Sequence, residues 1–453
     1  MRDSIGIERL GTPTVVLLTE PFSTTAKLTA ELTGLEALPT VSIPHPQAGL
    51  PRDVVYQRIS AVIDDITSAL FQTPGAGEVV AGTKIIKKPE PEVIVISGES
   101  NSDALRKVNR HFYQERWTDG FPIVPPTEEA VQWMLTGTDR DPSEIVALIP
   151  LAYGKATIRN IAINCVMAGA EPEYMPVVIA AVEAITDPQF AVGVQAWGAA
   201  GMQTTTGPVT PLLIVSGPVA KDLNIESGYG CFSRGHQANA TIGRALRLIL
   251  TNAGGAYPGI NDMKGQGGSQ EFTFCVAEQE ENRVYHQGAK AWQPLHVERG
   301  FPRETSTVTA VAAWPPLNIE DFYDCSPKIL DRVVAAISNL AVVPYTLDRE
   351  CVLILNPTHA ECLADAGMSK DDIRQYVYAN AVMPWRWYKE QYPGPFRLQP
   401  RWMQHIVDES TTVHLFESPE NFHIIVAGGP CPYSQVVRAS YKIATKEIRL
   451  PKK

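Results

Sequence analysis

The pattern of apolar and polar positions predicts a chain in which short buried strands alternate with helices. Apolar runs of four to eight residues, often β-branched and bounded by glycine or proline, are typical of buried strands. These runs are residues 14–18, 40–43, 93–96, 211–216, 272–277, 306–313, 351–355 and 422–427. Apolar residues at helical spacing predict helices over 51–71, 156–170, 176–185 and 238–250. We therefore expect an α/β protein with mixed sheets, and we find no internal repeat of fixed period.

The beginning of the chain contains too few strands for a complete sheet. Residues 1–72 contain two predicted strands, whereas a doubly wound sheet usually has more. This segment is expected to be the N-terminal half of a doubly wound-type module that a partner chain completes. The expected organisation is a partial module at 1–72, a Gly/Pro/Lys/Glu-rich linker at 73–92, an α/β body with a glycine-rich loop at 93–320 and a C-terminal α/β region at 321–453.

Composition narrows the class of protein. The chain has 453 residues, of which 44% are hydrophobic and 19% charged, so it can bury a sizeable core. The net charge of −10 argues against nucleic acid as a partner, because phosphate binding requires a basic surface. No apolar run reaches 18 residues and no signal peptide is visible, so we expect a cytoplasmic protein without membrane contact. The seven cysteines are odd in number and include no C-x-x-C pair, which argues against a disulfide framework or a zinc ribbon.

Several strings carry a resemblance to a known family. RLGTPTVVLLTEPF at 9–22, TGL at 33–35 and IPHPQAGLP at 43–51 resemble the C-terminal half of the UGSC-type (seleno)protein module. ATIRNIAIN at 156–164, ANATIGRALR at 238–247 and PLHVERGF at 294–301 resemble a larger companion sequence that accompanies this family. The family is named for a selenocysteine- or cysteine-containing U/C-G-S-C motif, which is missing here because no cysteine precedes Cys165.

The resemblance implies that a smaller subunit supplies the Cys-Gly-Ser-Cys thiol. Thr19 and Glu20 follow the first predicted strand, and His45 follows the second. If these strands are parallel neighbours, their ends meet at one edge of the sheet. We expect Thr19, Glu20 and His45 to surround the incoming cysteine, although Glu20 also fits ordinary strand-end punctuation.

A glycine-rich loop is a candidate anion site. SGYGCFSRGH at 227–236 runs into a predicted helix, whose first N–H groups could bind a carboxylate or phosphate. Arg234, His236, Asn239 and Arg244 are the expected substrate-binding residues, together with Thr19. The alternative is a tight turn between two packed elements.

His296 and Glu298 form a second candidate site. In an extended segment both side chains would point to the same side. Together with Glu278 and Glu280 they could form an acid–base pair or a site for a divalent metal. The alternative is a histidine with one hydrogen bond beside a solvated acidic turn, so the metal stays open.

Cysteines supply a third group of candidates. Cys431 follows a predicted strand and precedes a predicted helix at Tyr433, where a thiol has a lowered pKa and is reactive. The alternative is a small residue in a tight turn. Cys165, Cys275 and Cys351 fit core positions. His359 and Cys362 could share a helix face, which is a weak indication of metal binding.

Three functions remain open. The first is a subunit of a heteromeric enzyme that acts on a small, anionic organic molecule by thiol-assisted C–S or C–heteroatom cleavage or by reduction. The second is a metal-dependent hydrolase or lyase using His296 and Glu298. The third is a non-catalytic scaffold subunit, which would explain the missing thiol.

Overall fold

The computed structural model describes residues 2–71, 93–191, 201–338, 350–387 and 406–452, apart from 24–25, 28–29, 31–37, 46, 48–49, 151, 204, 260–261, 288–289, 323–326 and 441. The fold is mixed α/β, as the sequence predicts. The linker expected at 73–92 lies outside the described residues.

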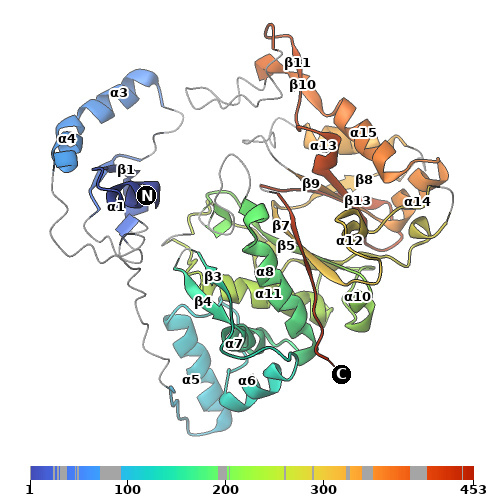
Figure 1. The fold of residues 1–453 in the computed structure, drawn as a ribbon, viewed down its shortest axis with the longest axis horizontal. Helices are drawn as coiled ribbons and strands as arrows, with labels where there is room; N and C mark the ends of the chain where they lie inside the picture. The colour runs from blue at the N-terminus through green and yellow to red at the C-terminus, as the bar shows by residue number, and fades with distance from the viewer. Residues whose placement is uncertain are drawn as a thin grey trace.

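The N-terminal segment contains a small parallel sheet with helices beside it (Figure 1). Its elements are α1 (Arg2–Arg9), β1 (Val16–Thr19), η1 (Glu20–Phe22), β2 (Thr40–Ile43), α3 (Arg52–Ser60) and α4 (Ile63–Phe71). β1 and β2 are parallel, with Thr19 opposite Ile43, which confirms the expected arrangement of their ends. The single helix expected over 51–71 is two helices, and no side chain of α3 is buried.

The body is built on two four-stranded sheets with the same plan. The first has the order β14-β7-β5-β6, and the second has the order β12-β9-β13-β8. In both, a central strand has a parallel neighbour on one side and an antiparallel neighbour on the other. The first sheet consists of β5 (Thr210–Ser216), β6 (Cys275–Ala277), β7 (Thr307–Ala313) and β14 (Ala444–Glu447). The second consists of β8 (Leu317–Glu320), β9 (Cys351–Leu355), β12 (Phe422–Val426) and β13 (Tyr433–Arg438).

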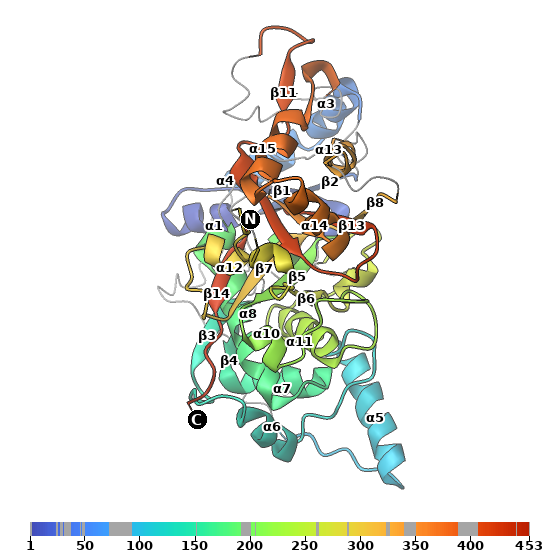
Figure 2. The ribbon, with the colours of Figure 1, turned by 90° about the vertical axis from the view of Figure 1, so that its right-hand side faces the viewer.

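The two sheets exchange their edge strands. β8 follows β7 in the chain but pairs with β13, whereas β14 follows β13 but pairs with β7 (Figure 2). The chain segments cross at an antiparallel bridge between Ala313 and Ala439. The indole Nε1 of Trp314 donates to Ser440 Oγ at 2.8 Å beside this bridge. Each sheet is therefore completed by an edge strand that follows, in the chain, a strand of the other sheet.

Alternating side chains of the strands separate the body into four layers. Leu212 and Ile214 of β5 pack with Val352 and Ile354 of β9 in an apolar cluster between the sheets. The intervening side chains, such as Leu213, face helices on the outside. The helices that share a core with the first sheet are α7 (Ile158–Ala168), α8 (Met175–Ile185) and α11 (Gln237–Asn252). Those that share a core with the second are α13 (Ile329–Ile337), α14 (Pro357–Asp365) and α15 (Lys370–Asn380).

Shorter elements join these layers. They are α5 (Asn101–Gln114), α6 (Glu128–Leu135), β3 (Ile145–Ile149), β4 (Gly154–Thr157), η2 (Pro172–Tyr174), η3 (Pro188–Ala191), α10 (Val219–Asp222), η4 (Ser269–Glu271), η5 (Arg283–Tyr285), α12 (Leu295–Glu298), β10 (Val382–Pro384), β11 (Thr412–His414) and η8 (Pro419–Asn421). The strand expected at 93–96 is wrong: this segment has no regular structure, and Val93 and Val95 are exposed.

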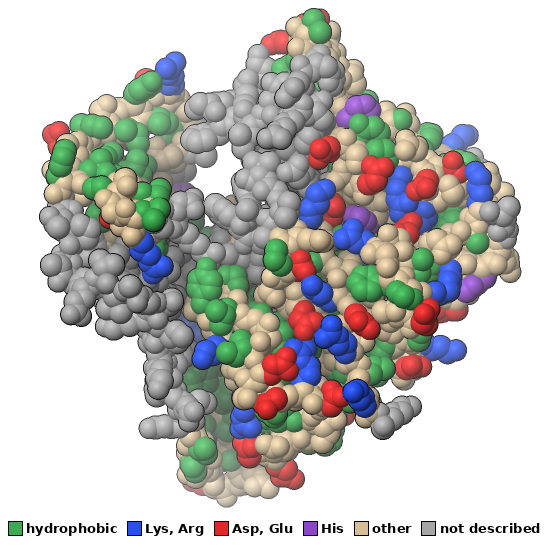
Figure 3. All heavy atoms as spheres, viewed as in Figure 1, with side chains coloured by type: hydrophobic (Ala, Val, Ile, Leu, Met, Phe, Trp, Pro, Cys, Tyr) green, Lys and Arg blue, Asp and Glu red, His purple; other side chains and the backbone are tan. Residues whose placement is uncertain are grey.

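Acidic and basic side chains are interspersed on the face of the body seen in Figure 3, without the basic stripe typical of phosphate-binding surfaces. Among the described helices, none has both the length and the apolar character needed to cross a membrane.

Candidate functional site

The strongest cluster of ionisable side chains lies at the carboxyl ends of β5 and β6. These strands are parallel, and the edge where parallel strands end is where α/β proteins commonly bind ligands. Ser216 and Gly217 lie at the end of β5, and Glu278 follows β6 directly. Glu278, Glu280 and His296 each place one oxygen or nitrogen atom within 4.8 Å of the others.

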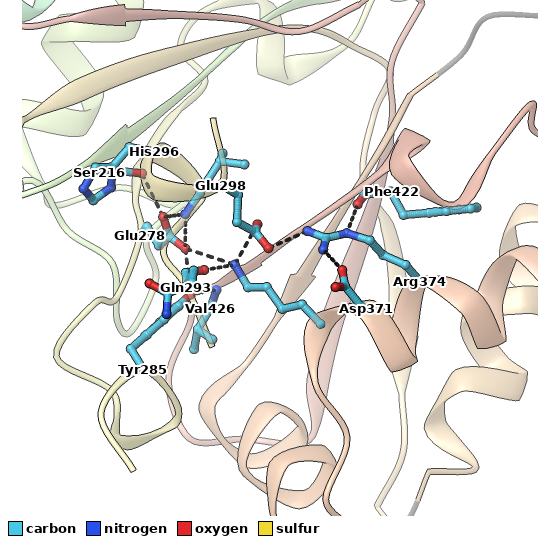
Figure 4. A network of polar contacts seen from close by, with 12 residues as sticks. Ser216, Glu278, Tyr285, Gln293, His296, Glu298, Asp371, Arg374, Phe422 and Val426 are labelled. Carbon is cyan, nitrogen blue, oxygen red and sulfur yellow. Dashed lines mark hydrogen bonds and ion pairs between the residues drawn. The ribbon is translucent and has the colours of Figure 1, made fainter. Parts of the chain in front are cut away.

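Glu278 is fully buried and accepts several hydrogen bonds (Figure 4). Ser216 Oγ donates to its Oε2 at 2.8 Å and the Tyr285 hydroxyl donates to its Oε1 at 2.7 Å. The backbone N–H of Leu295 donates to both oxygens, at 2.9 and 3.1 Å. Burial raises the pKa of Glu278, and the positive charge of Lys370, 3.8 Å away, opposes this rise. Because Leu295 is the first residue of α12, Glu278 anchors the helix that carries His296.

His296 is buried, and its ring lies between a backbone carbonyl and a carboxylate. Nε2 lies 3.2 Å from the carbonyl oxygen of Arg303, and Nδ1 lies 3.4 Å from Oε1 of Glu280. The same oxygen of Glu280 accepts a hydrogen bond from the N–H of Gly217 at 2.5 Å. Burial is the largest single influence and lowers the pKa of His296, but Glu280, the carbonyl of Arg303 and the charge of Glu278 together outweigh it, so the pKa is raised overall. Glu280 keeps 20% of its side chain exposed, so it is the member of the pair that faces the outside.

Glu298 does not join His296, contrary to the expectation from their spacing. The segment is the short helix α12 rather than an extended strand. Residues two apart in a helix point to nearly opposite sides. Glu298 instead accepts bonds from Lys370 at 3.2 Å and Arg374 at 2.7 Å (Figure 4). The carboxylates beside His296 are therefore those of the acidic run at 278–281. For this run, the alternative interpretation from the sequence was a solvated turn.

The glycine-rich loop packs against the loop that contains Cys431. Gly428 donates its N–H to the carbonyl of Ser227 at 2.6 Å. A Cβ on Gly429 would lie 2.2 Å from the ring of Tyr229, so these loops are in direct contact. His236 precedes α11, and its Nε2 lies 3.1 Å from the carbonyl of Tyr229.

Asn239 is buried and bonds only to backbone in the described part of the chain. Its Oδ1 accepts from Glu226 N at 2.8 Å, and its Nδ2 lies 2.9–3.2 Å from the carbonyls of Glu226, Cys231 and Cys275. These bonds fix the start of the loop, and contact of Asn239 with a substrate stays a prediction.

Arg244 and Arg234 differ in their surroundings. Arg244 makes two hydrogen bonds to the Asp119 carboxylate, at 2.8 and 3.0 Å, and a third to the carbonyl of Pro122. A substrate anion would have to compete with Asp119 for this guanidinium. Arg234 is exposed and remains the cation of this loop for which anion binding stays a prediction.

The cysteines fall into different environments. Cys431 is exposed and carries a free thiol, but Tyr433 begins β13 and not a helix, so the expected activation by a helix N-terminus is wrong. Cys165, Cys275 and Cys351 are buried, as expected, and burial raises the pKa of each to about 12. Cys362 forms a disulfide, so its sulfur does not join His359 in a metal site.

Thr19 and His45 meet at the end of the N-terminal sheet. Thr19 Oγ1 and His45 Nδ1 are 3.1 Å apart, in an exposed position. Glu20 begins the short helix η1, which follows β1. The parallel pairing of β1 and β2 thus brings together two of the three residues expected around a partner thiol.

Two residues of the site were not anticipated. Gly217 positions Glu280, and Lys370 lies beside Glu278 although it is 92 positions further along the chain. The sequence signal for this site as a whole was the spacing of Glu278 and Glu280 directly after a buried apolar run. Lys370 left no signal, because only the fold brings α15 to the end of β6.

Comparison with known proteins identifies one region. Residues 1–72 match the UGSC family. No curated protein and no solved structure matches the chain.

Proposed function

We propose that the chain is a hydrolase or lyase for a small organic molecule, with Glu280 and His296 as its acid–base pair. The observation that supports this most directly is the 3.4 Å contact between the partly exposed Glu280 carboxylate and the buried His296 ring. A buried imidazole beside a carboxylate at the carboxyl edge of a sheet is a common arrangement for general acid–base catalysis.

The exposed fractions of the Glu280 and His296 side chains suggest the catalytic role of each. Glu280 can meet a substrate or a water molecule because one-fifth of its side chain is exposed, whereas His296 is enclosed. Glu280 would take the proton from the reacting group, and His296 would orient and stabilise its charge. The N–H of Gly217 holds the same carboxylate oxygen in place. Glu278 would act indirectly, by fixing α12 through the N–H of Leu295.

The test is turnover of a panel of small chromogenic esters, thioesters and β-elimination substrates by the full chain. Glu280→Gln should lower turnover by roughly two to four orders of magnitude, the usual contribution of a general acid or base. His296→Gln should lower it in the same direction. Glu281→Gln, at an exposed neighbouring acid, is the matched control and should retain activity. Unchanged turnover in both Glu280→Gln and His296→Gln would refute the proposal.

A second function is supported by a different observation, the contact between Thr19 and His45 in the segment that matches the UGSC family. We propose as the alternative a heteromeric enzyme in which a smaller subunit with a Cys-Gly-Ser-Cys motif places a thiol at this edge. Histidine beside a cysteine favours the nucleophilic thiolate. Coexpression of the two chains should then give activity that is lost on thiol alkylation and in His45→Gln but kept in Glu280→Gln. The reverse pattern would support the acid–base pair in the body.

A further inference from the structure

We propose that Glu278, Glu280 and His296 bind one divalent transition-metal ion, with zinc as the preferred ion. The inference rests on the proposed function in that it assigns a cofactor to the same site. The three residues come from the ends of β6 and from α12, and their ligand atoms lie within 4.8 Å of one another.

The hydrogen bonds of His296 make Nδ1 an available ligand atom. The carbonyl oxygen of Arg303 can only accept, so Nε2 carries the proton that lies between them. In the neutral ring Nδ1 is then a lone pair that points toward the Glu280 carboxylate, which is also an acceptor. Nδ1 is buried and makes no hydrogen bond within the described residues. Two acceptors that face one another require a proton or a metal ion between them, and a metal ion would also engage Glu278.

The separation of these acceptors suits zinc. Zinc bonds of about 2.0–2.2 Å to nitrogen and oxygen, with a tetrahedral angle, place two ligand atoms roughly 3.3–3.5 Å apart. Nδ1 of His296 and Oε1 of Glu280 are 3.4 Å apart. Metal-binding histidines usually donate their other ring N–H to a carbonyl or carboxylate, as Nε2 does to Arg303.

Glu278 is the third ligand, and on it the ion would replace one branch of a shared hydrogen bond. A carboxylate offers about four lone-pair positions. Ser216 and Tyr285 each donate to one oxygen of Glu278, and the N–H of Leu295 is shared between both oxygens, so these contacts occupy all four positions. The ion can take the place of the longer, 3.1 Å branch from Leu295, because this N–H keeps its 2.9 Å bond to Oε2. Lys370, at 3.8 Å, is an ion pair and not a hydrogen bond. With three protein ligands the fourth position remains for water or substrate, as in catalytic rather than structural zinc sites.

The charges of the site also favour a divalent cation. Two carboxylates and a neutral imidazole place two negative charges in a largely buried group, and Lys370 offsets one of them. Lys370 is shared with Glu298 and the carbonyl of Gln293, and Arg374 pairs with Glu298 and Asp371. Buried charges are costly unless they are paired or bind a metal.

The experiment measures binding of zinc and manganese ions to the full chain, with any affinity tag removed and endogenous metal stripped by chelation. Isothermal titration should show one zinc ion per chain, bound more tightly than manganese. His296→Gln and Glu280→Gln should each weaken zinc binding at least tenfold. Glu298→Gln is the matched control, because Glu298 lies in the same short helix but faces Lys370 and Arg374. Circular dichroism would verify that the variants are folded.

A measurement on the wild type alone tests the inference without depending on whether the variants fold. Cobalt added to the stripped wild-type chain should give the intense visible absorption of a four-coordinate site, and zinc should remove it. No stoichiometric zinc binding, or equal affinity in His296→Gln, would overturn the inference. If zinc does not bind but Glu280→Gln abolishes turnover, the metal is refuted and the acid–base function stands. If zinc binds and neither variant affects turnover, the metal site stands and the proposed function is refuted.

Discussion

Arg244 on α11 and Asp119 in the loop after α5 form a two-point ion pair in which only 4% of the Asp119 side chain is exposed. The pair connects the middle of the body's longest described helix to a segment more than 100 positions earlier in the chain. Arg244 therefore stabilises the packing of the loop after α5 against α11.

The first prediction follows from this pair. Arg244→Ala leaves the buried Asp119 carboxylate without its cation, which should lower the free energy of unfolding by about 3 kcal/mol. Urea denaturation would measure the loss. Arg234→Ala, at an exposed position, is the control and should change stability by less than about 0.5 kcal/mol. Equal stability of the two variants would contradict the structural role of Arg244.

Positions of strands could be predicted from the sequence where apolar runs are uninterrupted. The run at 351–355 coincides with β9, because a short β-branched segment buried on both faces has few other structures available. The run at 40–43 coincides with β2, in which exposed and buried side chains alternate as in a strand with one solvated face. Tyr433–Arg438 was misassigned, since its polar residues carry no continuous apolar signal. The exchange of β8 and β14 was not predictable, because strand pairing depends on the packing of the whole body and leaves no local pattern.

The candidate site was predictable in its residue types but not in its pairing. His296 and the acids at 278 and 280 were recognisable as chemistry-bearing residues. Their partnership depends on where η5 and α12 return to the end of β6, which only the fold determines. The wrong partner, Glu298, followed from assuming an extended segment where Pro294 precedes a helical turn.

The second prediction concerns Asn239, which holds the glycine-rich loop. Asn239→Asp replaces the donor amide by a carboxylate that faces three backbone carbonyls. Loss of a buried donor costs about 1–3 kcal/mol, and repulsion between acceptors adds to this. We expect Asn239→Asp to lower the free energy of unfolding at neutral pH by more than Asn239→Ala. Thermal and urea denaturation would show the order, and a milder effect of the aspartate would contradict the assigned contacts.

The third prediction is a pH dependence that arises at Glu350. Burial raises the pKa of this carboxyl, but His423 and the N–H of Ile443 outweigh burial, with a smaller contribution from Lys442, so the pKa is lowered overall. A lowered carboxyl pKa stabilises the fold above the unfolded-state value of about 4.3. This contribution is lost as the pH falls through the lowered folded-state pKa.

Glu350→Gln tests that dependence. The variant should be less stable than the wild type at pH 7 by about 2 kcal/mol, the range for hydrogen bonds to a charged group. The difference should shrink as the pH falls below 4.3, because the wild-type carboxyl then becomes neutral as well. Denaturation midpoints over a pH series would measure it, with Glu281→Gln as an exposed control. A difference that does not change with pH would contradict the lowered pKa.

The last prediction concerns Gly217, which supports the candidate site from the end of β5. Its φ of +91° is unfavourable for other residues, and a Cβ here would lie 2.6 Å from the carbonyl oxygen of Thr305 and 2.8 Å from Cα of Ser306. Gly217→Ala should therefore lower the free energy of unfolding by about 3 kcal/mol, through backbone strain and overpacking together. Because its N–H fixes Glu280, the substitution should also weaken zinc binding. Gly235→Ala separates the two causes, since Gly235 has a φ of +105° but no atom within 4 Å of the added Cβ. Urea denaturation of both variants should show the larger loss at Gly217, and equal losses would mean that the backbone near Thr305 moves aside without cost.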